Sequence, residues 1–207
     1  MKAYAFIFLL SPCIRTEIVI LFYYIKIFEV KMSEIWDLYD RDRNPLGVTH
    51  VRGHYLPKGT YHIAVGIWTV NSKNEVLLTL RSPQKRDWPN VWENTAGSLL
   101  HGEGSREGAV RELREETGIT VTEDELHFLG TERGRNVIGD CYIVRNDTDI
   151  KDIVFQEGET VDAKWVTLPE LDKMIEEGLV APPVSKRLRK IRKDFENFIY
   201  RKDENNE

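Results

Sequence analysis

The sequence predicts a single mixed α/β domain in which helices pack against a sheet. Runs of strand length that are rich in β-branched and aromatic residues are interrupted and followed by helical segments. Strands and helices in this order are typical of an α/β sandwich. The chain has 207 residues, of which 41% are hydrophobic, and this is enough for one well-buried core.

The first predicted strand, residues 60–70, reads T-Y-H-I-A-V-G-I-W-T-V and has the composition of a buried strand. The turn N-S-K-N separates it from residues 75–81, so these two strands are expected to form a hairpin. Further strands are predicted at 126–132, 137–145, 153–156 and 163–166. Helices are predicted at 105–117, 168–177 and 184–200.

The helix predicted at 105–117 concentrates like charge on one face. With 3.6 residues per turn, Glu112, Glu115 and Glu116 lie together, and Gly118 is the expected C-terminal stop. Like charges at this spacing destabilise a helix by about 0.2–0.5 kcal/mol per pair. Pairing of Arg111 with Glu115 would relieve part of this repulsion.

Two explanations of the remaining charge are open from the helix alone. Pairing of Glu107 and Glu115 with Arg111 makes an ordinary solvated face, but it leaves Glu112 and Glu116 without a cation on the helix. A divalent cation would remove the repulsion. Mg²⁺ or Mn²⁺ prefers carboxylate oxygens and keeps waters that a phosphate can displace.

The spacing around this helix narrows the choice. Residues 97–119 fit the pattern G-x5-E-x7-R-E-U-x-E-E-x-G-U, in which U is aliphatic. This pattern resembles the Nudix box, so the chain is identified by resemblance as a member of the Nudix hydrolase family. The resemblance covers roughly residues 60–180. It implies an α/β/α sandwich with a mixed sheet, in which the box forms a loop–helix–loop.

The resemblance also implies roles for the box residues. Glu115 and Glu116 are expected to bind Mg²⁺, with Mn²⁺ as an alternative. Glu112 is either a further ligand or the general base, because the family uses this position in both ways. Arg111 is expected to orient a glutamate, and Glu103 to support the metal shell or to fix the loop before the helix. For these last two residues, simple pairing along the helix is the alternative.

Residues outside the helix complete the expected site. Gly97 is expected to let the backbone approach the metal. Glu159, favoured over Glu157, is expected as a further metal ligand because the family often has a glutamate shortly before a tryptophan like Trp165. Phosphate contacts are expected at Arg81, which ends the second strand, and at Lys85 and Arg86 in the loop that follows it. Either Trp88 or Trp92 is expected to stack on a base, with a place in the core as the alternative for both.

Residues 34–104 also resemble type I isopentenyl-diphosphate isomerase and the hydrolases related to it. The shared features are His62, Arg81 and the W-P-x-x-W segment. That isomerase needs a cysteine and a histidine just after the segment matching residues 92–95, where this chain has A-G-S and is one residue shorter. Its box also tends to be degraded, whereas this box is intact. Both departures favour hydrolysis over isomerisation.

The expected reaction is therefore Mg²⁺-dependent hydrolysis of a diphosphate linkage in a nucleoside diphosphate derivative. The alternatives are an isomerase-like enzyme and a non-catalytic module that binds a nucleotide. The box leaves the substrate open among ADP-ribose, nucleotide sugars, oxidised dNTPs, dinucleoside polyphosphates and coenzyme A. Homodimerisation is common in the family.

Charge and cysteine content bound the partners. The formal net charge is −5, which is not typical of a nucleic-acid-binding protein. The basic run K-R-L-R-K-I-R-K at 186–193 has two interpretations, a patch that binds phosphate or nucleic acid and a solvated helix face whose apolar side packs inward. The solvated face is favoured because the whole chain is acidic. Two cysteines, Cys13 and Cys141, form no disulfide framework, so a reducing, cytoplasmic location is expected.

Residues 1–31 are apolar and aromatic, unlike the remainder. A signal peptide would lack a small-x-small cleavage site, and a membrane anchor would be interrupted by Arg15 and Glu17 before reaching ~18 apolar residues. The favoured interpretation is an extension upstream of a true start at Met32. The Nudix domain is then residues 32–207, and no membrane segment is expected.

Overall fold

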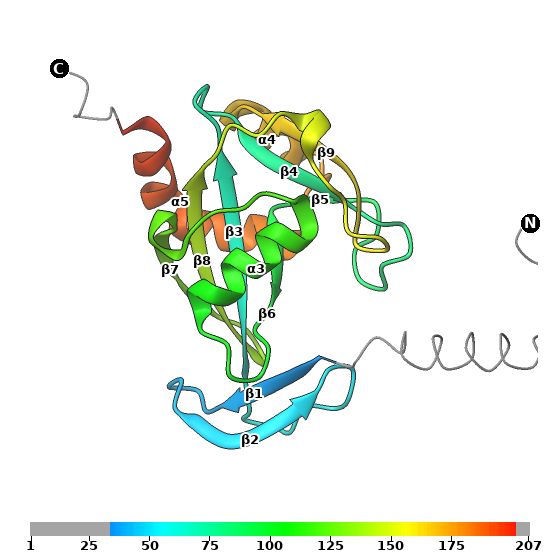
Figure 1. The fold of residues 1–207 in the computed structure, drawn as a ribbon, viewed down its shortest axis with the longest axis vertical. Helices are drawn as coiled ribbons and strands as arrows, with labels where there is room; N and C mark the ends of the chain where they lie inside the picture. Colours follow the sequence, from blue (N-terminus) through cyan, green and yellow to red (C-terminus); the bar gives the residue numbers. More distant parts are fainter. Residues whose placement is uncertain (1–33, 202–207) are drawn as a thin grey trace, which may run out of the picture. The chain divides into compact units, whose positions relative to one another are not determined.

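The computed structural model describes residues 34–201, so the expectation about residues 1–31 lies outside the described residues. The fold below is that of the unit Trp36–Glu207. It has three layers, with helices on both faces of a mixed sheet (Figure 1). Among residues 34–201, no helix is both long and apolar enough to cross a membrane.

The middle layer is a seven-stranded sheet. Its main path runs β5 (Trp92–Glu93), β4 (Val76–Arg81), β3 (His62–Val70), β8 (Val137–Arg145) and β7 (His127–Arg133), while β6 (Thr95–Ser98) pairs with β3 and β9 (Thr160–Val166) with β4. Only β3 and β8 are parallel. The other side of β3 is shared, with β6 along residues 64–67 and β4 at Val70. On this side of β3, the partner strand therefore changes from β6 to β4, and the sheet splits between these two strands.

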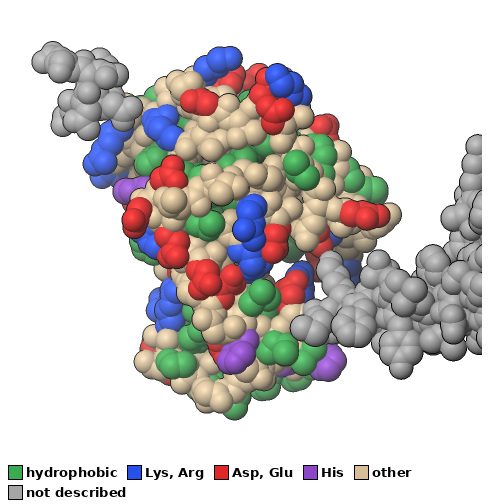
Figure 2. All heavy atoms as spheres, in the orientation of Figure 1, with side chains coloured by type: hydrophobic (Ala, Val, Ile, Leu, Met, Phe, Trp, Pro, Cys, Tyr) green, Lys and Arg blue, Asp and Glu red, His purple; other side chains and the backbone are tan. Residues whose placement is uncertain are grey.

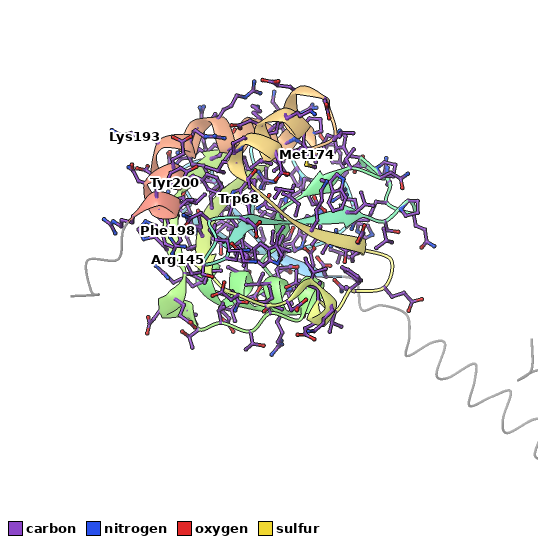
Figure 3. The ribbon with its side chains drawn as sticks, turned by 90° about the horizontal axis from the view of Figure 1, so that it is seen from above. Trp68, Arg145, Met174, Lys193, Phe198 and Tyr200 are labelled. Atoms are coloured by element: carbon purple, nitrogen blue, oxygen red, sulfur yellow. The ribbon has the colours of Figure 1, made fainter. Side chains whose placement is uncertain are left out.

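Alternation along the strands builds two cores. Ile63, Val65 and Ile67 face α3 (Ser105–Thr117), while Trp68 and Val70 face α4 (Leu168–Glu176) and α5 (Pro182–Tyr200). Figure 3 shows α4 and α5 on one side of the sheet and α3 on the other, with Trp68 between the sheet and the two C-terminal helices. This is the period-two pattern of a strand buried on both faces.

The expected elements are present with one exception. Residues 153–156 were predicted as a strand but are irregular, following a 3₁₀ turn at Ile150–Asp152. The Val154 N–H donates to the carbonyl of Thr117 at the end of α3 (3.0 Å), so this short apolar run is anchored to the helix instead of the sheet. The predicted inward face of α5 is confirmed, since Leu188, Ile191, Phe195 and Phe198 belong to the core or pack against it.

A hairpin that sequence patterns did not reveal precedes the domain core. Strands β1 (Ile35–Tyr39) and β2 (Pro45–Val51) form their own two-stranded sheet. Arg43 in the turn donates to both oxygens of Asp140 at 2.8 and 2.6 Å, and Asp140 is 1% exposed. Burial opposes ionisation of Asp140, but its bonds from Arg43, Ser105 and Thr131 outweigh this and lower its pKa. One ion pair thus joins the hairpin to the sheet.

Candidate active site

Helix α3 presents its three clustered glutamates in different environments. It begins after Gly104 and ends at Gly118, whose φ of 75° confirms the predicted left-handed stop. The exposed fraction of the side chain is 39% for Glu115 and 12% for Glu112, and Glu116 as a residue is only 6% exposed. Figure 2 shows acidic and basic side chains intermixed on the face of the molecule that α3 covers. The three carboxylates are therefore not equivalent.

Gly97 and Glu112 fit together. Strand β6 places Gly97 opposite Val65 on β3, beside α3. A Cβ added at Gly97 would meet the carboxyl carbon and both oxygens of Glu112 at separations that real Cβ atoms essentially never show. The Glu112 carboxyl group occupies the space that any side chain at position 97 would need.

Arg111 holds the remaining carboxylates of the box. Its Nε and Nη2 donate to the two oxygens of Glu103 at 2.7 and 2.8 Å, and Nη1 donates to Glu112 (2.9 Å) and Glu115 (3.1 Å). The prediction that Glu112 lacks a cation on the helix is therefore wrong, because the wide guanidinium fork reaches its neighbour in sequence. The predicted pair of Glu107 with Arg111 is also replaced, since Glu107 accepts from the Gly104 N–H instead.

Glu103 fixes the loop before the helix, which was one of its two expected roles. Besides its two bonds to Arg111, it accepts from the Leu100 N–H at 2.9 Å. Burial opposes ionisation, but these bonds outweigh it and lower the pKa of the Glu103 carboxyl. The Arg111 fork also reaches the carbonyl of Ser98 at 3.0 Å, so one side chain connects α3, the loop and β6.

Glu116 is the electrostatic anomaly of the site. Burial raises the pKa of its carboxyl well above the ordinary range, and the nearby carboxylates of Glu93 and Glu112 act in the same direction. The N–H of Ala96 donates to it and opposes this only in part. Among the described residues, its Oε2 is fully buried and has no hydrogen-bond partner. A buried acceptor without a donor is costly.

Glu93 belongs to this centre, although sequence reasoning assigned it no role. It lies on β5 and pairs with Arg81 at the end of β4, with Nη1 and Oε1 2.6 Å apart. Burial raises the pKa of Glu93 in spite of Arg81. Glu93 reaches the centre because β5 pairs with β4. No local sequence pattern defines the register of that pairing, so sequence analysis had no signal for Glu93.

The loop at 82–90 lies beside the centre. Arg81 donates to the carbonyls of Asp87 and Trp88 at 2.8 and 2.9 Å, so its guanidinium shapes this loop as well as pairing with Glu93. Lys85 from the loop forms an ion pair with Glu159. Trp88 is 48% exposed and has a positive φ of 48°, and Arg86 is exposed.

The predicted site residues thus divide into three groups. Gly97, Glu112 and Glu116 meet where β6 borders α3, and Arg111 joins Glu103 and Glu115 to them. Lys85 and Glu159 pair beside them, and the charge of Lys85 acts on Glu116. Arg86 and Trp88 lie in the neighbouring loop, on exposed positions.

A divalent cation fits the chemistry of this centre. Across residues 34–201, no group of three or more His, Cys, Asp or Glu side chains is already gathered as a metal cluster. The buried oxygen of Glu116 nevertheless lacks a donor, and two carboxylates beside it raise its pKa. A hard cation with oxygen ligands would satisfy that atom and neutralise those charges.

Comparison with known proteins agrees with this geometry. A family model described as NUDIX domain matches residues 60–188. A Nudix hydrolase of Listeria monocytogenes is 33% identical over 150 residues, which is 72% of this chain and 89% of that relative. An isopentenyl-diphosphate Delta-isomerase of Citrobacter koseri is 31% identical over 86 residues, covering 41% of this chain and 48% of its own length.

A solved structure shows the same fold. The crystal structure of DR0079 from Deinococcus radiodurans gives a TM-score of 0.64 at 22% identity, covering 81% of this chain and all of that one. The predicted sandwich with a mixed sheet is thereby confirmed. Since the family model spans more than half of the sequence and the Listeria relative is similar over most of its length, the chain belongs to the Nudix hydrolase family.

Proposed function

We propose that this chain hydrolyses the diphosphate linkage of a nucleoside diphosphate derivative with Mg²⁺ as its cofactor. Family membership supports a hydrolase acting on diphosphate bonds. The observation that carries the metal dependence is the buried, unpartnered carboxylate oxygen of Glu116 beside Glu93 and Glu112. Mn²⁺ would meet the same oxygen ligands.

The box residues would divide the work. Mg²⁺, when bound, would offset the carboxylate charge and that developing on the phosphates. Glu116, Glu115 and Glu112 would supply oxygen ligands, and Gly97 leaves the space that the Glu112 carboxyl group occupies. Glu159, which directly precedes β9, would be the further ligand. Glu112, which accepts a hydrogen bond from Arg111 at 2.9 Å, is either one of these ligands or the base that accepts the proton of the attacking water.

The substrate would enter past the loop at 82–90. Lys85 and Arg86 offer charges for phosphate oxygens, and the half-exposed ring of Trp88 offers a stacking surface for a base. Arg81 already donates to Glu93 and to two carbonyls of the loop. Its contribution to substrate binding would therefore come chiefly from the loop conformation that these bonds hold. Homodimerisation and a cytoplasmic location stay predictions from the sequence.

Isomerase activity is the second candidate because isomerase relatives match part of the chain. Its chemistry needs a thiol at the substrate. Within residues 34–201 the free cysteine is Cys141, which is buried in the core between the sheet and α5. The positions after β5 carry Ala96, Gly97 and Ser98. These observations favour hydrolysis.

The test is a panel of diphosphates with Mg²⁺ or EDTA. It contains ADP-ribose, a nucleotide sugar, an oxidised dNTP, a dinucleoside polyphosphate, coenzyme A and isopentenyl diphosphate, and products are followed by phosphate-resolved chromatography. We expect Mg²⁺-dependent cleavage of a nucleotide, which Glu116→Gln abolishes. Glu107→Gln is the matched control, because it makes the same charge change on α3 at a residue whose side chain, among residues 34–201, accepts from the Gly104 N–H alone. Isomerised isopentenyl diphosphate without hydrolysis would refute the proposal.

A further inference from the structure

Two glycines make a low floor on the face of the sheet opposite α3. Gly66 follows Val65, which faces α3, and lies beside Cys141, which faces α5. Gly139 on β8 faces the same way as Cys141, two residues away. Both glycines are buried. Because glycine has no side chain, these two positions leave a gap in the middle of the sheet, where the strands otherwise carry large apolar residues.

The guanidinium of Arg187 from α5 covers this floor. A Cβ added at Gly66 would lie 3.5 Å from Nη1 of Arg187, and one added at Gly139 would lie 3.9 Å from it. The same Cβ at Gly66 would lie 3.3 Å from Nδ2 of Asn94, a buried amide. The glycines thus leave room for a planar charged group, which rests against the sheet.

Arg187 has more donors than the fold uses. Its Nε donates to the carbonyl of Pro183 at 3.3 Å, and within residues 34–201 its Nη1 and Nη2 make no hydrogen bond or ion pair. Arg187 is half-buried, and these two nitrogens are not fully enclosed by the protein. Arg192 on the same helix is the opposite case, because Asp172 and Glu196 occupy its fork at 2.6–2.7 Å.

Two carboxylates near Arg187 are already neutralised. Glu132 on β7 lies opposite Gly139, and it pairs with Lys190 at 2.7 Å. Glu93, on which the charge of Arg187 acts, pairs with Arg81 at 2.6 Å. Arg187 is therefore a surplus positive charge with an open fork, which is the arrangement that recognises phosphate.

We propose that Arg187 binds a second phosphate of the substrate, a phosphate monoester separate from the diphosphate at the acidic centre. This inference rests on the proposed function. The box carboxylates lie on the α3 side of β3 and β6, whereas Arg187 lies on the α5 side, so Arg187 is not part of the cluster around Gly97 and Glu112. On one side of β3, the hydrogen-bonded partner changes from β6 to β4 along the strand. The charge of Arg187 acts on Glu93, which lies just before β6. The favoured substrates are nucleotides that carry an additional phosphate.

Binding of two ligands that differ by one phosphate monoester tests the assignment. Adenosine 3′,5′-bisphosphate and AMP are titrated calorimetrically into the full chain with Mg²⁺, using wild type, Arg187→Gln and Arg187→Lys. We expect wild type to bind the bisphosphate about tenfold more tightly or better. Arg187→Gln should bring the ratio close to one, and Arg187→Lys, which keeps charge without the planar fork, should be intermediate. Arg189→Gln, an exposed arginine of the same helix, should leave the ratio unchanged.

Several results would overturn the assignment. Equal affinities in wild type, an unchanged ratio in Arg187→Gln or binding of neither ligand would each do so. A lower melting temperature with an unchanged ratio would make Arg187 structural. Because binding needs no turnover, Glu116→Gln should keep the ratio while losing hydrolysis. If Arg187→Gln loses the affinity ratio between the bisphosphate and AMP but the wild type hydrolyses no nucleotide, only the proposed function is refuted. If the wild type hydrolyses a nucleotide but Arg187→Gln keeps the affinity ratio, only this inference is refuted.

Discussion

Replacing Gly97 by alanine should abolish most of the activity while leaving the fold intact. A Cβ at this position would lie well inside 3.0 Å of the Glu112 carboxyl group, whereas ordinary contact begins at 3.4 Å. The carboxyl group must therefore move by more than ~1 Å. A displacement of this size at a reacting group can cost ~10²-fold in rate, or about 2.7 kcal/mol. The backbone of Gly97 does not have a positive φ, so alanine adds no backbone strain.

The assay is steady-state kinetics on whichever panel substrate is cleaved, together with thermal unfolding. We expect kcat of Gly97→Ala to fall by ~10²-fold. Gly104→Ala is the control from the loop that follows β6, where φ is −75° and Oε2 of Glu107 would lie 3.9 Å from an added Cβ. It should cost at most ~1 kcal/mol in helix capping and leave kcat unchanged. Full activity in Gly97→Ala would refute the reasoning, because Glu112 would then not need its observed position.

Three further predictions concern single side chains. Arg111→Lys should lower kcat by about 10–100-fold, because an ammonium cannot hold both oxygens of Glu103 and the other carboxylates at once; an unchanged kcat would show that the fork only supports the fold. Mg²⁺ at 100 times its Kd should stabilise wild type by about 2.7 kcal/mol, a rise of about 5–10 °C in melting temperature, and Glu116→Gln should lose most of this; equal shifts would exclude Glu116 as a ligand. Asp140→Asn should cost about 1–3 kcal/mol at pH 7. Since the folded pKa of Asp140 is lowered, its stabilisation is present above the unfolded value near ~3.9 and is lost below it, so urea unfolding should show the two proteins converging at acidic pH.

Local patterns were sufficient for the catalytic helix and the central sheet. Residues 105–117 form a helix with the predicted bounds, because the sequence supplies an apolar stripe, no proline and a glycine stop. Residues 137–145 form the predicted strand for a similar reason, since their β-branched run is buried on both faces. The helix depends mainly on interactions between residues close in sequence, and those shape its pattern. The strand pairs with the distant β3, but its burial on both faces leaves a composition that is recognisable without knowing its partner.

Features set by distant residues were out of reach. The hairpin β1–β2 is held by the pair of Arg43 with Asp140, 97 positions apart. Residues 153–156 have strand composition, but the hydrogen bond of Val154 to Thr117 decides their conformation. Glu93 joins the acidic centre only because β5 pairs with β4. In each case the deciding partner lies far away in the sequence.

The like charges on α3 are tolerated for two different reasons. Arg111 donates hydrogen bonds from one guanidinium to Glu103, Glu112 and Glu115, which offsets the repulsion that helix spacing alone predicts. Glu116 is excluded from that arrangement, because it points into the sheet toward Ala96 and meets Glu93, whose own cation is already committed. The fold therefore pairs three carboxylates with Arg111 and leaves one buried oxygen of Glu116 for a ligand that residues 34–201 do not supply. A helix that was merely solvated would have no reason to bury that oxygen, so the position of Glu116 argues for a cation more strongly than the number of glutamates does.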